Sequence, residues 1–268
     1  MQNPVAVSSW ALHRTLGLSF HDSPSTGPRG QEQHAVPQVA LLDLPAELAR
    51  RGYPAMQLCH FHLPTRDDAY CAEFRAALDS SGVELHALLI DEGDITHPDH
   101  GERDAEWIAS WLQTAEQLGA KHARVIAGKQ TATAETLERS IERLKILVKS
   151  SPVRIEIENW FPLTDIPEAV LEILDRLEGH VGLCADWGNW PRPRKYTDLP
   201  KIVSRAETCH AKLEFLSPAQ LDLEDSLLCL AMTKIVGFSG AYVLVNGGPG
   251  ESEWDALEIQ RKFLASGP

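Results

Sequence analysis

Two carboxylates, an imidazole and an amine occur near the ends of three consecutive β-rich segments: Glu158, Asp186, His210 and Lys212. Two carboxylates and one imidazole form a donor set for a divalent cation such as Mn²⁺, Mg²⁺ or Zn²⁺. Lys212 follows His210 by one two-residue period of a strand, where it could polarise a substrate oxygen or hold a phosphate. A single acid near a strand end is more often a hydrogen-bonded structural group, so both interpretations stay open at this point.

The elements that must position these residues alternate along the whole chain. Short β-rich runs are separated by segments in which apolar residues recur with helical spacing. Such alternation predicts a parallel sheet, and eight units in 268 residues favour a closed (β/α)8 TIM barrel over an open doubly wound sheet. No GxGxxG or phosphate-binding loop follows the first run. We therefore expect one α/β domain over residues 1–268, with strands at 5–10, 56–63, 83–91, 122–128, 153–160, 181–188, 207–215 and 241–247.

The expected barrel places its active site at the carboxyl ends of the strands, which is where Glu158, Asp186 and His210 fall. The stretch 17–37 is polar and contains Gly and Pro, so we expect an extended loop over one face of the barrel. Thr133 is a predicted helix N-cap for the run that ends near Lys149.

Composition limits the partners. The chain has 25 Lys and Arg against 38 Asp and Glu, and the net charge of −13 disfavours nucleic-acid binding. No apolar run approaches 18 residues, so we expect no membrane span. Residues 1–12 lack the basic and apolar regions of a secretion signal, and the five cysteines include no CxxC pair. These features are typical of a cytoplasmic protein with reduced thiols.

Four short motifs, considered together, carry a family resemblance: Arg-Val-Ile-Ala-Gly at 124–128, Glu-Asn-Trp at 158–160, Cys-Ala-Asp-Trp-Gly-Asn at 184–189 and His-Ala-Lys at 210–212. The chain resembles the xylose isomerase-like TIM-barrel superfamily over nearly its whole length, and more narrowly its sugar phosphate isomerase/epimerase branch. The resemblance implies a small sugar substrate, a possible homodimer, and one divalent metal held by Glu, Asp, His and Glu on strands 5 to 8. It also implies proton transfer between adjacent sugar carbons through an enediolate. Glu158, Asp186 and His210 match the first three ligands, and Glu158 would also be a catalytic base.

The eighth strand departs from that pattern because residues 241–247 contain no carboxylate. Val245 aligns with the expected Glu, Asn246 could offer a neutral amide oxygen, and Glu251 could fold back after the turn. Epimerisation needs an acid on each face of the reacting carbon, and one of these is missing. The alternative is a degenerate, sugar-binding protein without turnover.

Aromatic and imidazole side chains near the strand ends are the candidate substrate contacts. Trp10, Trp160 and Trp187 could stack on the C–H face of a sugar. We also expect His62 to contact substrate and His60 to be an ordinary polar residue of the barrel mouth. A multi-zinc nuclease on abasic DNA is disfavoured, since the segment after Asp186 offers no histidine.

The remaining charged residues lead to two structural predictions. Arg124 and Glu156 point inward on adjacent strands, so we expect them to form an ion pair, because an isolated buried charge is costly. Asp91, Glu92 and Asp94 are expected to form a solvated acidic loop. The cysteines on strands 2, 6 and 7 are predicted to be buried packing residues.

Overall fold

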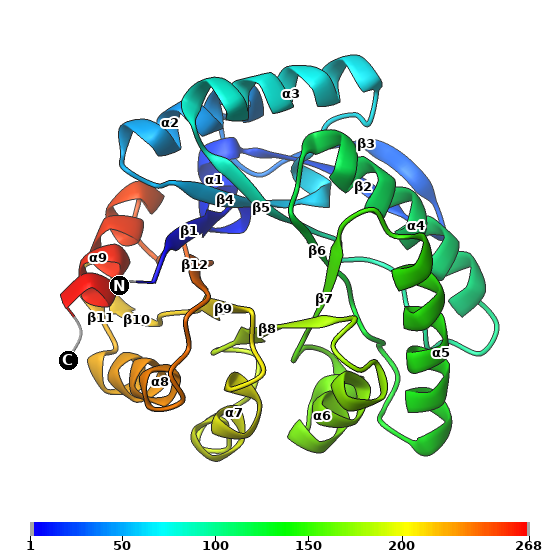
Figure 1. Ribbon diagram of the computed structural model, residues 1–268. Coiled ribbons are helices and arrows are strands. Elements are labelled where there is room, and N and C mark those ends of the chain that lie inside the picture. Colours follow the sequence, from blue (N-terminus) through cyan, green and yellow to red (C-terminus); the bar gives the residue numbers. More distant parts are fainter. Residues whose placement is uncertain (1–2, 267–268) are drawn as a thin grey trace.

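Eight parallel strands close into a barrel in the computed structural model, which describes residues 3–266 (Figure 1). Their order around the barrel follows the order along the chain, so the predicted (β/α)8 TIM barrel is confirmed. The strands are β1 (Val5–Ser8), β4 (Ala55–Cys59), β5 (Glu84–Leu89), β6 (His122–Arg124), β7 (Arg154–Glu158), β8 (Gly182–Asp186), β9 (Thr208–Ala211) and β12 (Ala241–Leu244).

Helices surround the barrel on the outside and bury their apolar faces against it (Figure 1). Thr133 caps the helix that follows β6, as predicted: its side chain accepts from the Thr136 amide, and the Thr136 hydroxyl accepts from the Thr133 amide. The α-helices are α1 (His13–Leu16), α2 (Leu44–Arg50), α3 (Asp68–Ser81), α4 (Gly101–Leu118), α5 (Ala134–Ser150), α6 (Pro167–Arg176), α7 (Lys195–Val203), α8 (Leu223–Ile235) and α9 (Glu253–Ser266).

Several strands end earlier than the sequence pattern suggested. β1 stops at Ser8 and β4 stops at Cys59, and each continues into a 3₁₀ turn, η1 (Ser9–Leu12) and η3 (His60–His62). Further 3₁₀ turns are η2 (Leu41–Asp43) and η4 (Pro162–Thr164). In a turn with three residues per repeat, residues i and i+2 no longer share a face. The strand alternation that placed His60 and His62 together therefore does not apply.

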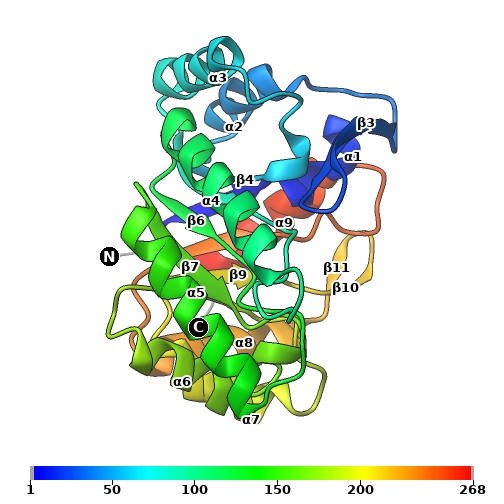
Figure 2. The same ribbon diagram turned by 90° about the vertical axis from the view of Figure 1, so that its right-hand side faces the viewer.

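The predicted loop over 17–37 is instead largely an antiparallel hairpin of β2 (Leu18–Ser23) and β3 (Gly27–Gln33). Most of its side chains are exposed, so it lacks the apolar alternation by which a half-buried strand is recognised. A second, shorter hairpin joins β10 (Phe215–Ser217) to β11 (Gln220–Leu221). Figure 2 shows both hairpins at the same end of the barrel, opposite the amino terminus.

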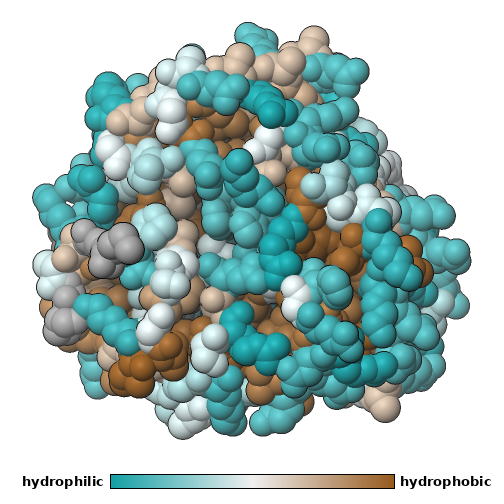
Figure 3. Space-filling view, in the orientation of Figure 1, coloured by the Kyte–Doolittle hydropathy of each residue, from teal (hydrophilic) through white to brown (hydrophobic). Residues whose placement is uncertain are grey.

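The apolar core lies between the barrel and its helices, whereas the barrel interior is partly polar. Inside, two small apolar groups, Ala6 with Val243 and Val245, and Cys59 with Ala87 and Leu89, sit beside buried charged residues. On the surface, apolar side chains gather over α8 in Figure 3, where four large residues are exposed: Leu223, Leu227, Leu228 and Ile235. None of the helices within residues 3–266 is both long and apolar enough to cross a bilayer.

Candidate functional site

A cavity of about 310 Å³ opens at the carboxyl ends of the strands. Its wall includes Glu158, Asp186, His210 and Lys212, the four candidate residues predicted from the sequence. Since each comes from or directly follows one of the adjacent strands β7, β8 and β9, the barrel brings them together at one level. The volume is at the small end of ligand pockets, a size that suits one small molecule.

The three predicted metal ligands face one another. His210 Nδ1 lies 3.5 Å from Glu158 Oε1 and 3.5 Å from Asp186 Oδ2, and all three side chains are about 95% buried. Asp186 Oδ1 accepts a hydrogen bond from the Gly188 amide at 2.6 Å, which leaves Oδ2 for the cavity. The donors thus converge as a divalent cation would require.

Gln57 on β4 controls the orientation of His210. His210 Nε2 lies 2.8 Å from Gln57 Oε1, an acceptor, so Nε2 carries the proton. When a cation is bound and the imidazole is neutral, the Nδ1 lone pair is therefore the one that can bind the cation, as is common for metal-binding histidines. Burial alone lowers the pKa of His210, but Cys184, Glu158 and Asp186 outweigh it and hold the pKa well above its usual value without a cation.

Cys184, predicted from the sequence to be a packing residue, is a further functional candidate. It lies on β8 two residues before Asp186, and its Sγ is within 4.8 Å of ligand atoms of Glu158 and His210. Burial raises the pKa of the thiol to about 11. In the sequence, only its spacing of two residues from Asp186 indicates that Cys184 shares a face with the site. A cysteine that merely packs inside the barrel could have the same spacing.

Arg124 does not pair with Glu156, so that prediction is wrong. The two are register neighbours on β6 and β7, but the guanidinium extends toward the mouth, where it pairs with Asp91 and lies 2.9 Å from Glu158 Oε2. Although burial lowers the pKa of Arg124, Asp91 and Glu158 raise it above its usual value. Glu158 Oε1 accepts from Asn189 Nδ2 at 2.7 Å, so both carboxylate oxygens are held.

The acidic loop after β5 is more ordered than predicted. Asp91 lines the cavity, and Asp94 is buried, where its carboxylate accepts from the amides of Thr96 and Lys129 at 3.0 and 2.9 Å. These hydrogen bonds lower the pKa of Asp94 although burial opposes them. The expectation of a solvated loop is therefore wrong for both residues.

Among the predicted substrate contacts, Trp10 and Trp160 line the cavity. Trp10 is half exposed in η1, and the Trp160 ring lies 5.2 Å from the Arg124 guanidinium carbon. Trp187 is buried instead, with its ring centroid 5.6 Å from that of Tyr242. The structure does not bring Trp187 to the cavity wall.

His62 also points away from the cavity. It is buried beneath η1, where Nδ1 lies 2.8 Å from Ser9 Oγ and Nε2 lies 2.9 Å from His13 Nδ1. His60, expected to be an ordinary residue of the mouth, is buried against Trp107 and Trp111 and accepts from the Asp91 amide at 3.3 Å. Both histidines thus contribute to packing around the mouth.

The structure has no carboxylate in the fourth ligand position. Val245 lines the cavity there, and the Asn246 amide is engaged, donating to Leu213 O at 2.8 Å and accepting from the Gly248 amide at 2.9 Å. Glu251 is exposed. Glu253 is buried nearby, but its carboxylate accepts from the Arg14 and Thr15 amides at 3.0 and 2.7 Å. The described residues therefore offer Glu158, Asp186 and His210, with Cys184 below them.

Comparisons with known proteins agree with the geometry. A family model described as a xylose isomerase-like TIM barrel matches residues 45–210. No curated protein sequence gives a significant match.

Solved structures share the fold at low sequence identity. A D-allulose 3-epimerase from Methylomonas sp. superposes with a TM-score of 0.70 at 12% identity, covering 99% of each chain. A xylose isomerase-like TIM barrel protein from Mycobacterium smegmatis, in complex with magnesium, gives 0.66 at 14%, covering 98% of this chain and 96% of its own. A 3-keto-D-glucoside 4-epimerase from E. coli gives 0.66 at 13%, covering 84% and 94%.

Proposed function

Because the chain belongs to the xylose isomerase-like TIM barrel family, we propose that it is a divalent-metal-dependent enzyme that isomerises a small sugar or sugar-like polyol. The observation that carries this proposal is the convergence of three side chains at the wall of a cavity of about 310 Å³. His210 Nδ1 lies 3.5 Å from a carboxylate oxygen of Glu158 and 3.5 Å from one of Asp186. The similar proteins include sugar epimerases and a magnesium complex, which agrees with the class of reaction and cofactor.

The donor set fits a hard or borderline cation of the Mn²⁺ or Mg²⁺ type, held by Glu158, Asp186 and His210. When bound, such a cation withdraws charge from substrate oxygens and makes the neighbouring C–H proton more acidic. Asn189 and Gln57 hold the ligand side chains in orientation through Glu158 Oε1 and His210 Nε2.

Glu158 takes the proton from the carbon next to the substrate carbonyl, and the electron pair of that C–H bond moves to give an enediolate. Lys212, on the same cavity wall, is a cation that stabilises the charge on the enediolate oxygen. While it is on the carboxyl group, this proton exchanges with solvent, and Glu158 then delivers a proton to the adjacent carbon on the same face. The hydroxyl proton passes from one enediolate oxygen to the other, so the carbonyl moves by one carbon. Trp10 and Trp160 supply apolar ring surface for the sugar and exclude water.

The strand 8 position favours one kind of reaction of the class over another. Epimerisation removes a proton from one face and adds one to the other, which needs two groups. Val245 is apolar, so we favour 1,2-isomerisation or a related elimination, in which one carboxylate suffices.

The second candidate is a sugar-binding protein without turnover. The observation that favours it is the Arg124–Glu158 ion pair of 2.9 Å, which competes with both metal binding and proton transfer at Glu158.

A deuterium-exchange experiment separates the two candidates. The purified protein is incubated with Mn²⁺ and a panel of aldoses and ketoses in D₂O, and carbon-bound deuterium is measured by NMR. We expect exchange at C1 or C2 of one sugar, loss of exchange in Glu158→Gln, and no change in Glu106→Gln, a matched exposed glutamate on α4. Calorimetric sugar binding with no deuterium incorporation would overturn the isomerase and favour the binding protein.

A further inference from the structure

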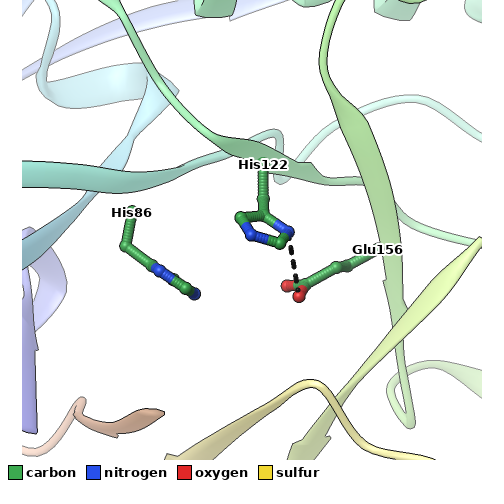
Figure 4. Close-up of side chains that lie close together, drawn as sticks. All are labelled: His86, His122 and Glu156. Atoms are coloured by element: carbon green, nitrogen blue, oxygen red, sulfur yellow. Dashed lines mark ion pairs between the residues drawn. The ribbon is translucent and has the colours of Figure 1, made fainter. Parts of the chain in front are cut away.

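A second cluster of potential metal ligands lies inside the barrel, away from the mouth (Figure 4). His86 on β5, His122 at the start of β6 and Glu156 on β7 each offer a ligand atom, and these atoms lie within 4.8 Å of one another. Glu156 precedes Glu158 by two residues, so it points into the barrel one pleat closer to the amino-terminal end. The three side chains come from adjacent strands, and Figure 4 shows them directed into one space.

The carboxylate of this cluster is fully buried and only partly satisfied. Glu156 Oε1 accepts from Thr208 Oγ1 at 2.7 Å and lies 3.3 Å from His122 Nδ1, whereas Oε2 has no hydrogen-bond partner among the described residues. The nearest arginine on its own strand, Arg154, is committed to Glu207, with Nε and Oε2 2.6 Å apart. A buried carboxylate with a free oxygen is costly unless a cation compensates it.

The two imidazoles lie side by side, and each offers a ring nitrogen to the cluster. Their rings stack with centroids 4.7 Å apart and planes at 28°. His86 Nε2 is buried and makes no hydrogen bond within the described part of the chain, whereas His122 Nδ1 is buried and faces Glu156 Oε1 at 3.3 Å. His86 Nδ1 lies 3.6 Å from Glu84 Oε1, so the far nitrogen faces a carboxylate, as metal-binding histidines often do.

We propose that His86, His122 and Glu156 bind a divalent transition-metal ion of the Zn²⁺ type, at a second site distinct from the one at the barrel mouth. Two imidazoles and one carboxylate match the ligands that Zn²⁺ prefers, while Mg²⁺ favours oxygen ligands and retained water. Small rotations of the two rings bring the ligand atoms to one ion. The bound ion neutralises Glu156 and joins β5, β6 and β7 at the end opposite the cavity.

Access and charge are consistent with this site. The His86 and His122 side chains are 15% and 21% exposed, so an ion can enter from solvent past the rings and keep a water ligand. Burial lowers the pKa of His86, which therefore remains a neutral ligand at neutral pH. Burial lowers the pKa of His122, but the Glu156 carboxylate outweighs it and raises the pKa above its usual value, so a bound ion takes the place of the His122 proton.

The test is titration of the metal-free protein with Zn²⁺, followed by calorimetry and thermal unfolding. The titration uses Asp186→Asn, which removes one ligand at the mouth and keeps an acceptor for the Gly188 amide. Glu158, Cys184 and His210 remain at the mouth, so the His86 variants below assign the bound ion to its site. We expect one Zn²⁺ to bind this variant, Tm to rise by about 5–10 °C at a hundredfold excess over Kd, and Mg²⁺ to have no such effect. No Zn²⁺ binding to Asp186→Asn would overturn the proposal.

The decisive comparison adds His86→Ala, which leaves the His122–Glu156 pair in place. We expect Zn²⁺ affinity to fall at least about tenfold and the Tm rise to disappear, whereas His100→Ala, in a stacked surface pair of imidazoles, behaves as its parent. His86→Gln repeats the test with a longer side chain if alanine impairs folding. Unchanged Zn²⁺ affinity in the folded His86 variants would refute the site, and neither result depends on whether the mouth is catalytic.

Discussion

Arg124 Nε lies 2.9 Å from Glu158 Oε2, and the same guanidinium pairs with Asp91, so one buried cation holds two carboxylates at the cavity wall. This contact fixes one oxygen of Glu158 and leaves Oε1 beside His210 and Asn189. The orientation of the proposed base is therefore set from β6, a strand outside the ligand set itself.

Replacing Arg124 by Met should destabilise the protein strongly. It leaves Glu158 and Asp91 without their cation, and removing one partner of a buried pair costs about 3–5 kcal/mol. The free energy of unfolding is measured in urea near neutral pH. Arg139→Met breaks a surface pair with Glu135 and should cost less than about 1 kcal/mol. Equal losses in the two variants would mean that the Arg124 pairs contribute no more than surface ones.

Val245→Glu should strengthen metal binding at the mouth. The new carboxylate enters the cavity wall on the strand that lacks one, and it adds a charged ligand to Glu158, Asp186 and His210. We expect the Kd for Mn²⁺ to fall at least about tenfold, a gain of about 1.4 kcal/mol, measured by calorimetry. Val245→Gln has the same length without the charge and should bind Mn²⁺ far more weakly. A glutamate variant no tighter than wild type would argue against a cation at this position.

The sequence was sufficient to predict the barrel and the three convergent donors because both depend on periodicity and on where parallel strands end. Glu158, Asp186 and His210 lie at matched heights since the register of β7, β8 and β9 is that of ordinary parallel neighbours. Contacts between long side chains depend on more than strand spacing. The Arg124 side chain is long enough to extend toward the mouth or toward the neighbouring strand, and the charged groups around it determine which contact forms.

Backbone turns account for another part of what could not be predicted. The chain leaves the strand conformation at Cys59, and this single change turns His62 away from the cavity and toward Ser9. Nothing in the apolar pattern of 56–63 signals a 3₁₀ turn. Cys184 was overlooked for a different reason, because its residue type is equally common in packed cores.

Acidification below pH 6.5 should destabilise the fold through His62. Burial, and then the neighbouring His13 and His60, lower its pKa to about 3, well below the usual value of 6.5 for histidine. Between these two pH values His62 binds a proton in the unfolded chain but not in the folded protein. The free energy of unfolding therefore rises with pH across this window and falls as the pH drops. At pH 5.5 the loss from this group is about 1.4 kcal/mol.

Between pH 4 and 6, His62→Gln should reduce the slope of the unfolding free energy against pH by the amount that corresponds to about one bound proton. Urea unfolding at several pH values measures it, and His180→Gln, at an exposed position, controls for the loss of an imidazole. A slope that stays the same in His62→Gln would show that other groups bind the extra proton.

Gly188→Ala tests the proposed role of Lys212 without altering its charge. A Cβ at residue 188 would overlap Lys212 Cδ and lie 3.0 Å from its Cγ, so the lysine side chain must move away from its place in the cavity wall. The overlap is with a flexible side chain, so we expect Tm to change by no more than a few degrees. If Lys212 stabilises the enediolate, deuterium exchange in Gly188→Ala should fall about as far as in Lys212→Met, by roughly 10²-fold for one lost stabilising group. Normal exchange in both variants would mean that Lys212 is not part of the reaction, and normal exchange in Gly188→Ala alone would mean that the ammonium reaches the substrate from its displaced position.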